Sequence, residues 1–302
     1  MRPFSIPKVR YDYEGQAAND LILKYMLDEK PRLIARFGNN ELSAIMNYLA
    51  VRDPRNRLYK TILYLRSEIG PCWWDEGTAA DLYWMAGVYP RDSVTVSRFA
   101  QRVLEDCKLV DILGSWQRDE CRLAHLMTKI LTVPLLTLEP YYYVNPWTSA
   151  LAGRKVLVVH PFAQSIKSQY LQRKTLFKDQ SVLPEFELQT VKAVQSAGGN
   201  ATGFPTWFAA LDWMCAEIAR HSFDIAIIGA GAYGMSLGAF VKSLGKKAVH
   251  MGRATQLLFG IKGRRWDKWT FYRDVLYNEH WIRPSEDERP KKADKIEEAC
   301  YW

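Results

Sequence analysis

The sequence has few of the features that mark secreted, disulfide-stabilised or membrane-spanning proteins. Only five of its 302 residues are cysteine, and no two of them form a Cys-x-x-Cys pair. This spacing argues against a zinc knuckle and favours reduced thiols in a cytosolic compartment. No stretch approaches the roughly 18 apolar residues of a membrane-spanning helix, and polar residues follow Met1–Lys8 where a signal peptide has its apolar core. We therefore expect a cytoplasmic protein, with peripheral contact to the inner face of a membrane as its closest approach to lipid.

The first half of the chain is nearly neutral, and most of the net positive charge lies in the second half. Residues 1–150 hold 19 Lys and Arg against 18 Asp and Glu, whereas residues 151–302 hold 22 against 15. Between residues 242 and 273, nine basic residues accompany a single acid, Asp267. The low charge of the first half argues against a general nucleic-acid binder. The basic block is either a solvated face or, because glycine and tryptophan interrupt it, a loop for a phosphorylated ligand.

The pattern of apolar residues predicts an α/β fold. In the second half, predicted strands at 155–160, 186–192, 224–228 and 247–251 alternate with helices that end near residues 173, 221 and 244. In the first half we expect helices at 17–30, 39–51, 59–68, 78–88 and 98–107, with strands at 32–37, 93–97 and 109–113. Uninterrupted apolar strands between helices are typical of a Rossmann-like, mostly parallel sheet with helices on both faces.

We expect a single domain over residues 1–283, which consists of an N-terminal half at 1–150 and a nucleotide-binding half at 151–283. Residues 284–302 form a charged C-terminal tail, of which we expect 284–295, rich in charge and proline, to be a mobile linker. The last two residues of the tail, Tyr301 and Trp302, are candidates for docking on the domain.

A glycine motif, Gly229-x-Gly231-x-x-Gly234, follows a predicted strand and begins a predicted helix. A dinucleotide site also needs an acidic residue at the end of the next strand to hold the ribose. That position holds His250-Met251-Gly252-Arg253, which includes no acidic residue, so NAD binding is not expected. Binding of NADP stays open as an alternative, because Arg253 is a candidate for contact with its 2′-phosphate. The glycines can also serve close strand–helix packing alone. We favour a diphosphate site, because amides at a helix start attract anions and the basic block follows.

Several segments resemble one family. Arg36-Phe37-Gly38-Asn39-Asn40-Glu41-Leu42 resembles the Arg-Phe-Gly-Asp-Gly-Glu signature of the GT-D-type bacterial glycosyltransferases. Residues 151–162, 224–234 and 252–266 also resemble segments of that family, and the resemblance extends from about residue 30 to the end. It implies a GT-D-like fold and transfer of a sugar from a nucleotide-diphosphate donor, foremost a UDP-sugar. The implied acceptor is a glycan or lipid-linked molecule in surface polysaccharide or glycoprotein assembly.

In that family an Asp-x-Glu pair serves the donor and a divalent metal. Here Asn39 occupies the Asp position and only Glu41 remains, so Asn39 and Glu41 are the candidate ligands for Mg²⁺ or Mn²⁺. An amide oxygen is a weaker ligand for these ions than a carboxylate. The alternative is that arginine and lysine side chains, in place of a metal, stabilise the negative charge of the departing nucleoside diphosphate.

Glycosyl transfer requires cations or amides at the departing diphosphate and a base near the sugar carbon. The candidates for the diphosphate are a set of basic residues together with the glycine motif: Arg36, Arg253, Lys262, Arg264, Arg265, Gly229, Gly231 and Gly234. The candidate catalytic residues are Glu41 and His160, which follow or end predicted strands. Structural roles remain open for both, as a helix-start acid and a hydrogen-bonded cap. Two rival functions are an NADP-linked oxidoreductase and a non-catalytic nucleotide-sugar-binding module.

Overall fold

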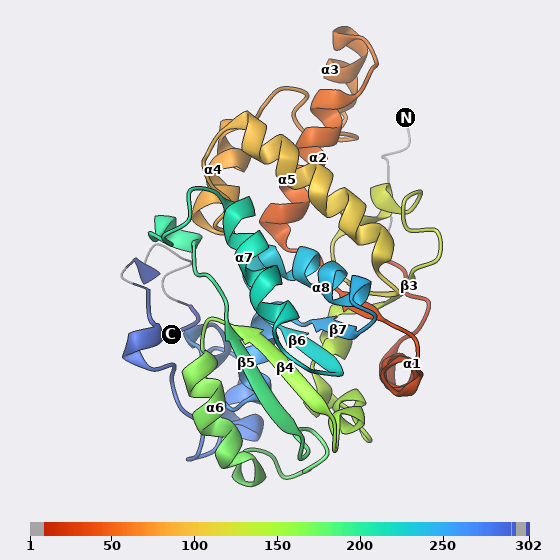
Figure 1. Cartoon of the computed structure of the whole chain (residues 1–302). Coiled ribbons are helices and arrows are strands. Elements are labelled where there is room, and N and C mark those ends of the chain that lie inside the picture. The colour runs from red at the N-terminus through yellow and green to blue at the C-terminus, as the bar shows by residue number, and fades with distance from the viewer. Residues whose placement is uncertain (1–8, 291, 294–299) are drawn as a thin grey trace.

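A computed structural model describes residues 9–290, 292–293 and 300–302. Its centre is a seven-stranded sheet with the strand order β3-β2-β1-β7-β6-β4-β5 (Figure 1). Every neighbouring pair of strands in this sheet is parallel. The predicted α/β fold with a Rossmann-like parallel sheet is therefore confirmed.

The second half follows the predicted pattern closely. Its strands and helices are β4 (Lys155–His160), α6 (Ala163–Leu171), β5 (Glu187–Lys192), α7 (Trp207–Ala219), β6 (Ile225–Ile228), α8 (Gly234–Ser243) and β7 (Lys247–His250). Strands β4, β6 and β7 are largely apolar because their side chains alternate between two covered faces, whereas the edge strand β5 is more polar and more exposed. In β4, Leu157 and Val159 enter one core, and Val156 and Val158 enter the other.

The first half contributes three strands and five helices to the described structure. These are α1 (Gly15–Leu27), β1 (Leu33–Ala35), α2 (Asn39–Arg52), α3 (Arg57–Leu65), α4 (Glu76–Trp84), α5 (Ser93–Asp106), β2 (Ile112–Ser115) and β3 (Leu131–Pro134). The predicted helices are all present within a few residues of their expected bounds. The edge strand β3 was not predicted.

The predicted strand at residues 93–97 is wrong, because α5 begins there. The Asp92 side chain accepts a hydrogen bond of 2.7 Å from the Thr95 amide and so caps the helix. Val96, Phe99 and Val103 lie on one buried face of α5, which is helical spacing. Tertiary burial therefore overrides the strand preference of the β-branched residues at the start of this segment.

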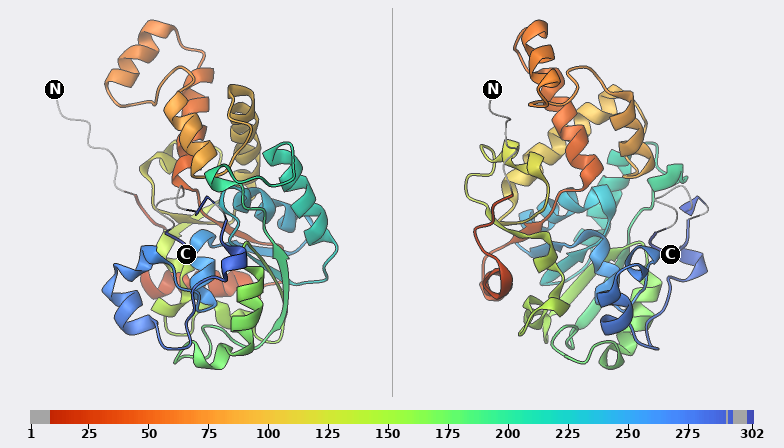
Figure 2. Two further views of the ribbon diagram at one scale, coloured as in Figure 1. Left: turned by 90° about the vertical axis from the view of Figure 1, so that its left-hand side faces the viewer. Right: turned by 180° about the vertical axis from the view of Figure 1, so that it is seen from behind.

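Helices cover both faces of the sheet. Helices α2, α5, α7 and α8 bury their apolar residues in one core, whereas α1, α6 and the short 3₁₀ segment η5 (Trp147–Leu151) bury theirs in the other. Helix α3 lies at the end of the molecule farthest from α6 (Figure 2). None of the helices in the described part of the chain combines the length and the hydropathy needed to cross a bilayer.

Strands β4 and β6 are neighbours whose following helices lie on opposite faces of the sheet. Helix α6 connects β4 to β5 on one face, and α8 connects β6 to β7 on the other. Parallel sheets place a ligand crevice at such a reversal, outside the carboxyl ends of the strands. The topology therefore directs attention to the loops after β4 and β6.

The described residues of the C-terminal tail pack against the domain. Glu288 is buried, and its carboxylate accepts hydrogen bonds from the amides of Gln164 at 2.7 Å and Ser165 at 3.2 Å. Trp302 is also buried and packs against Phe162, with 5.9 Å between the ring centroids. The tail therefore returns to the start of α6 and to the edge of the sheet where the strands end.

Candidate active site

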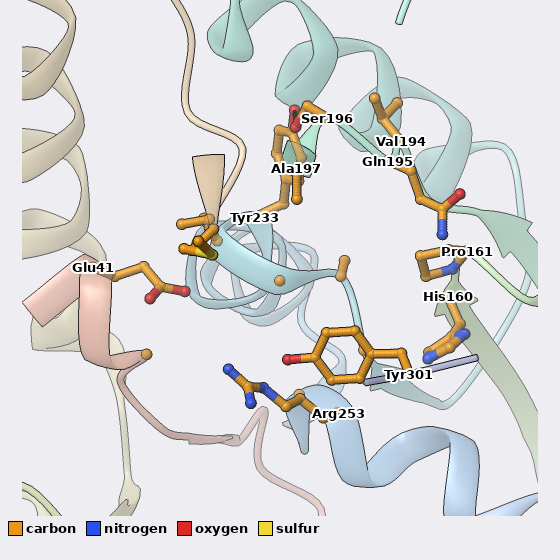
Figure 3. A pocket seen from close by; sticks show the side chains of 18 of the residues that line it. Glu41, His160, Pro161, Val194, Gln195, Ser196, Ala197, Tyr233, Arg253 and Tyr301 are labelled. Atoms are coloured by element: carbon orange, nitrogen blue, oxygen red, sulfur yellow. Dashed lines mark hydrogen bonds between the residues drawn. The ribbon is translucent and has the colours of Figure 1, made fainter. Parts of the chain in front are cut away.

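A pocket lies at the carboxyl ends of β1, β4, β6 and β7, where the topology places a crevice. Its cavity measures about 190 Å³. Many of the sequence-predicted residues line it: Arg36, Asn39, Glu41, His160, Gly229, Gly231 and Arg253. Figure 3 shows the Glu41 carboxylate, the Arg253 guanidinium and the Tyr301 hydroxyl directed toward one space, with His160 on its other side.

The remaining predicted residues are not in the described lining of this pocket. Gly234 begins α8 behind the pocket, and its Cα abuts the His250 ring. The Lys262 Nζ lies 5.3 Å from the centroid of the Tyr277 ring. Arg264 and Arg265 are exposed on the short helix α10 (Arg264–Asp267), where the Arg265 amide donates to the Cys300 carbonyl. The basic block therefore contributes Arg253 to the pocket but not these three cations.

Arg36 brings a positive charge into the pocket directly after β1. Its guanidinium lies 5.6 Å from the centroid of the Trp116 ring. Within residues 9–290, 292–293 and 300–302, the guanidinium makes no hydrogen bond and no ion pair. Burial lowers the pKa of Arg36, the Glu41 carboxylate opposes this shift, and the positive charge of Arg253 adds to it. A guanidinium with five donors and no acceptor partner is suited to an anionic ligand.

Arg253 adds a second guanidinium to the lining of the pocket. It lies in the 3₁₀ turn η9 (Gly252–Ala254), which follows β7, and it sits 5.1 Å from the centroid of the Tyr301 ring. Arg36 and Arg253 are close enough for each to affect the other electrostatically. Two like charges held together in one pocket favour a ligand with more than one negative charge.

The glycine loop, Gly229–Gly231, leads from β6 toward α8 and lines the same pocket. A Cβ at Gly229 would lie 2.4 Å from His160 Cδ2 and 2.8 Å from the Gly252 carbonyl oxygen, so no side chain fits there. Gly231 starts the 3₁₀ turn η8 (Gly231–Tyr233), which leads into the ten-residue helix α8. The loop therefore keeps its backbone open to the pocket at the positive end of the α8 dipole.

Glu41 is the carboxylate in the described lining of the pocket. It is the third residue of α2, and a Cβ at Gly38 would lie 1.8 Å from Glu41 Oε2. The glycine before the helix is therefore needed for the side chain to fold back toward the pocket. This position also suits the structural role of a helix-start acid. A carboxylate that faces the cavity has the geometry of a proton acceptor.

His160 is held as a neutral hydrogen-bond donor. Its Nδ1 accepts a hydrogen bond of 3.0 Å from the Phe162 amide, which places the ring proton on Nε2. Burial lowers the pKa of His160 to about 3. A ring with an occupied Nδ1 and a protonated Nε2 is better suited to donate to a ligand oxygen than to remove a proton. The hydrogen bond to Phe162 also matches the alternative role of a cap.

His250 is a second buried histidine in the lining, and the sequence did not single it out as a ligand contact. Its Nδ1 lies 3.3 Å from the Ile228 carbonyl oxygen, to which it donates, and burial lowers its pKa to about 3. Tyr301 and Trp302 reach the same pocket from the end of the tail. Their only signal in the sequence is a pair of aromatic residues after a charged segment.

The donor atoms of the pocket fit a divalent cation poorly. Glu41 supplies one carboxylate, Asn39 is an exposed amide, and Arg36 and Arg253 place two positive charges beside them. The described residues hold no group of three or more His, Cys, Asp or Glu side chains that could bind a metal. Mg²⁺ and Mn²⁺ prefer several charged oxygens. We therefore derive no chemical step through a metal.

Comparison with known proteins finds two remote structural likenesses. No family model and no curated protein sequence matches this chain. A selenomethionine structure of domain of unknown function 1792 is 8% identical, with a TM-score of 0.43, covering 87% of this chain and 98% of its own. A second structure, described as domain of unknown function 1792 with a distinct glycosyltransferase fold, is 8% identical with a TM-score of 0.45, covering 91% of each chain. Similarity of this degree does not assign the chain to a family.

Proposed function

We propose that this protein is a glycosyltransferase that uses a nucleotide-diphosphate sugar, foremost a UDP-sugar. The observation that carries the proposal is the Arg36 guanidinium, which faces the pocket without an ion pair to any described residue. Arg253 and the amides of the Gly229–Gly231 loop complete an electropositive cradle around the same space. The resemblance of residues 36–42 to a glycosyltransferase signature supports the same ligand class.

In the proposed reaction, the acceptor hydroxyl oxygen bonds to the anomeric carbon of the donor sugar. The bond from that carbon to the diphosphate oxygen breaks, and its electron pair leaves with the nucleoside diphosphate. Arg36, Arg253 and the loop amides stabilise the negative charge that develops on the diphosphate. Glu41 takes the proton of the acceptor hydroxyl, and His160 donates from Nε2 to a donor oxygen.

The cavity size indicates how much of the donor is enclosed. Pockets for drug-sized ligands measure roughly 300–1,000 Å³, whereas this cavity measures about 190 Å³. It therefore suits the diphosphate and the atoms next to it, while the rest of the donor extends beyond it. The acceptor in this proposal is a glycan or lipid-linked molecule of surface polysaccharide or glycoprotein assembly.

The test is a screen of nucleotide sugars for release of free nucleoside diphosphate, with wild type and Glu41→Gln compared. We expect release by wild type from at least one donor and a large loss in the variant. Release that is equal in both proteins would remove Glu41 from the mechanism. Binding of UDP without release from any donor, with or without acceptors, would favour a non-catalytic module.

A parallel measurement separates the oxidoreductase alternative. A ligand that binds only the native state raises the midpoint of thermal unfolding. We expect UDP to raise it and NADPH to leave it unchanged, because the proposal assigns Arg253 to the donor diphosphate and residues 251–256 hold no other cation for the 2′-phosphate of NADPH. A shift with NADPH and none with UDP would overturn the proposal.

A further inference from the structure

A second and wider groove opens beside the proposed donor pocket. It measures about 880 Å³, and it shares wall residues with the donor pocket: Val194, Gln195, Ser196 and Pro290. Figure 3 shows Val194, Gln195, Ser196 and Ala197 along one wall of the donor pocket. The groove therefore adjoins the donor pocket on the side of β5.

The shared wall is held in place by hydrogen bonds. Ser196 Oγ donates to the Gly87 carbonyl oxygen at 2.6 Å and lies 3.0 Å from the Tyr233 hydroxyl. Tyr233 follows the glycine loop, so the wall is tied directly to the donor pocket. A molecule in the groove can therefore present an end to the pocket at a fixed position.

Aromatic rings form much of the groove. Four of them line it: Tyr83, Tyr89, Phe204 and Trp213. Trp213 is 39% exposed on α7, and its ring centroid lies 5.5 Å from that of Phe204. The Tyr89 hydroxyl is 2.6 Å from Thr202 Oγ1, which fixes its ring at the edge of the groove. Partly exposed aromatic rings of this kind are suited to stack on the apolar faces of sugar rings.

Charge in the groove is mainly positive. Of the residues that the structure describes, Lys192, Arg289 and Lys292 line it, together with one acid, Asp287. Lys192 is exposed at the end of β5, in register with His160 at the end of β4. Lys292 is positioned by a hydrogen bond of 3.1 Å from Nζ to the Gly199 carbonyl oxygen. A neutral sugar chain needs no such excess of cations, whereas carboxylate or phosphate groups do.

We infer that this groove binds the acceptor and that the acceptor is an anionic oligosaccharide. This inference rests on the proposed function, since the adjoining pocket must hold the donor. The aromatic rings would stack on the sugar rings, and Lys192 with Lys292 would pair with acidic groups. The accepting hydroxyl would then reach past Gln195 toward Glu41.

The test measures binding of tetragalacturonate and of its methyl-esterified form, which is the same chain without charge. We expect the charged form to bind at least about tenfold more tightly and to lose affinity as salt is raised. An oligosaccharide of the same length with one terminal phosphate tells phosphate recognition apart from carboxylate recognition. Equal affinity for the charged and neutral chains would overturn the inference.

Two variants place the binding in the groove. Trp213→Ala and Lys192→Gln should each weaken tetragalacturonate binding by about tenfold, while Lys178→Gln, an exposed lysine outside the groove, should not change it. The unfolding midpoint reports whether each variant is folded. Undiminished binding in both groove variants would overturn the inference.

Measuring UDP binding with the same protein distinguishes failure of this inference from failure of the proposed function. UDP binding without any binding of the charged oligosaccharides overturns the groove assignment and leaves the donor proposal standing. Binding of tetragalacturonate without any response to UDP overturns the donor proposal, and with it the assignment of the groove to an acceptor.

Discussion

Replacing Arg36 with glutamine should weaken UDP binding without lowering the stability of the protein that has no ligand bound. The guanidinium faces the pocket without an ion pair or hydrogen bond to a described residue, so desolvation of its charge opposes folding. Its removal should leave the unfolding midpoint of the protein without ligand unchanged or raise it. An arginine that serves the fold would show the opposite effect.

Affinity for UDP should fall in the same variant. A hydrogen bond to a charged group contributes about 1.5–3 kcal/mol, and each 1.4 kcal/mol or so is tenfold in affinity, so we expect a loss of roughly 10- to 150-fold. At a UDP concentration of about 100 times the wild-type Kd, UDP stabilises wild type by about 2.7 kcal/mol. A 100-fold higher Kd reduces this to about 0.4 kcal/mol at the same concentration.

Thermal unfolding with and without UDP, together with calorimetric titration, measures both effects. The matched control is Arg264→Gln, which removes the same charge from an exposed position outside the pocket. We expect it to change the Kd by less than about twofold, because exposed charges are screened by salt. An Arg36→Gln protein that is strongly destabilised and binds UDP like wild type would refute the reasoning.

Three further expectations follow from the same site. Glu41→Gln should lower the transfer rate by about 10²- to 10⁴-fold, with UDP affinity retained. Gly38→Ala should also lower the transfer rate, because its Cβ would lie 1.8 Å from Glu41 Oε2. A fully active Gly38→Ala protein would contradict this geometry. Transfer should survive EDTA, and a loss that Mg²⁺ or Mn²⁺ restores would contradict the poor fit of the donor atoms to a metal. Burial lowers the pKa of His160 and of His250 from 6.5 to about 3. Between these pH values the unfolded state therefore binds more protons than the folded state. The free energy of unfolding should fall as pH decreases from about 6.5 toward 3. Denaturant titrations across that range measure this slope, which should be smaller in His250→Asn; an unchanged slope would mean that His250 is not buried as a neutral ring.

The second half of the fold could be predicted because its local and tertiary signals agree. The apolar runs of β4, β6 and β7 are buried on both faces, and glycines follow β6 where the chain turns into a helix. The first half was harder. Residues 93–97 carry strand-forming residues on a helix, and β3 is a four-residue edge strand that ends in Pro134. In these segments, tertiary contacts decide the structure.

The candidate site likewise contains some residues that could be predicted from the sequence and others that could not. Arg36, Glu41, His160 and Gly229 could be predicted because each follows or ends a strand, and parallel strands bring such residues together. Arg264 and Arg265 could not be placed, because a run of charge along the chain does not specify where a loop returns in space. Docking of Tyr301 on the domain could be predicted, but its place in the pocket could not, because it depends on the long-range contact of the tail with α6.

The most direct test of the central claim is a crystal structure with UDP bound. We predict the diphosphate between the Arg36 and Arg253 guanidinium groups, against the amides of Gly229–Gly231. A diphosphate bound elsewhere, for example at Arg264 and Arg265 on α10, with this pocket left empty, would contradict the account.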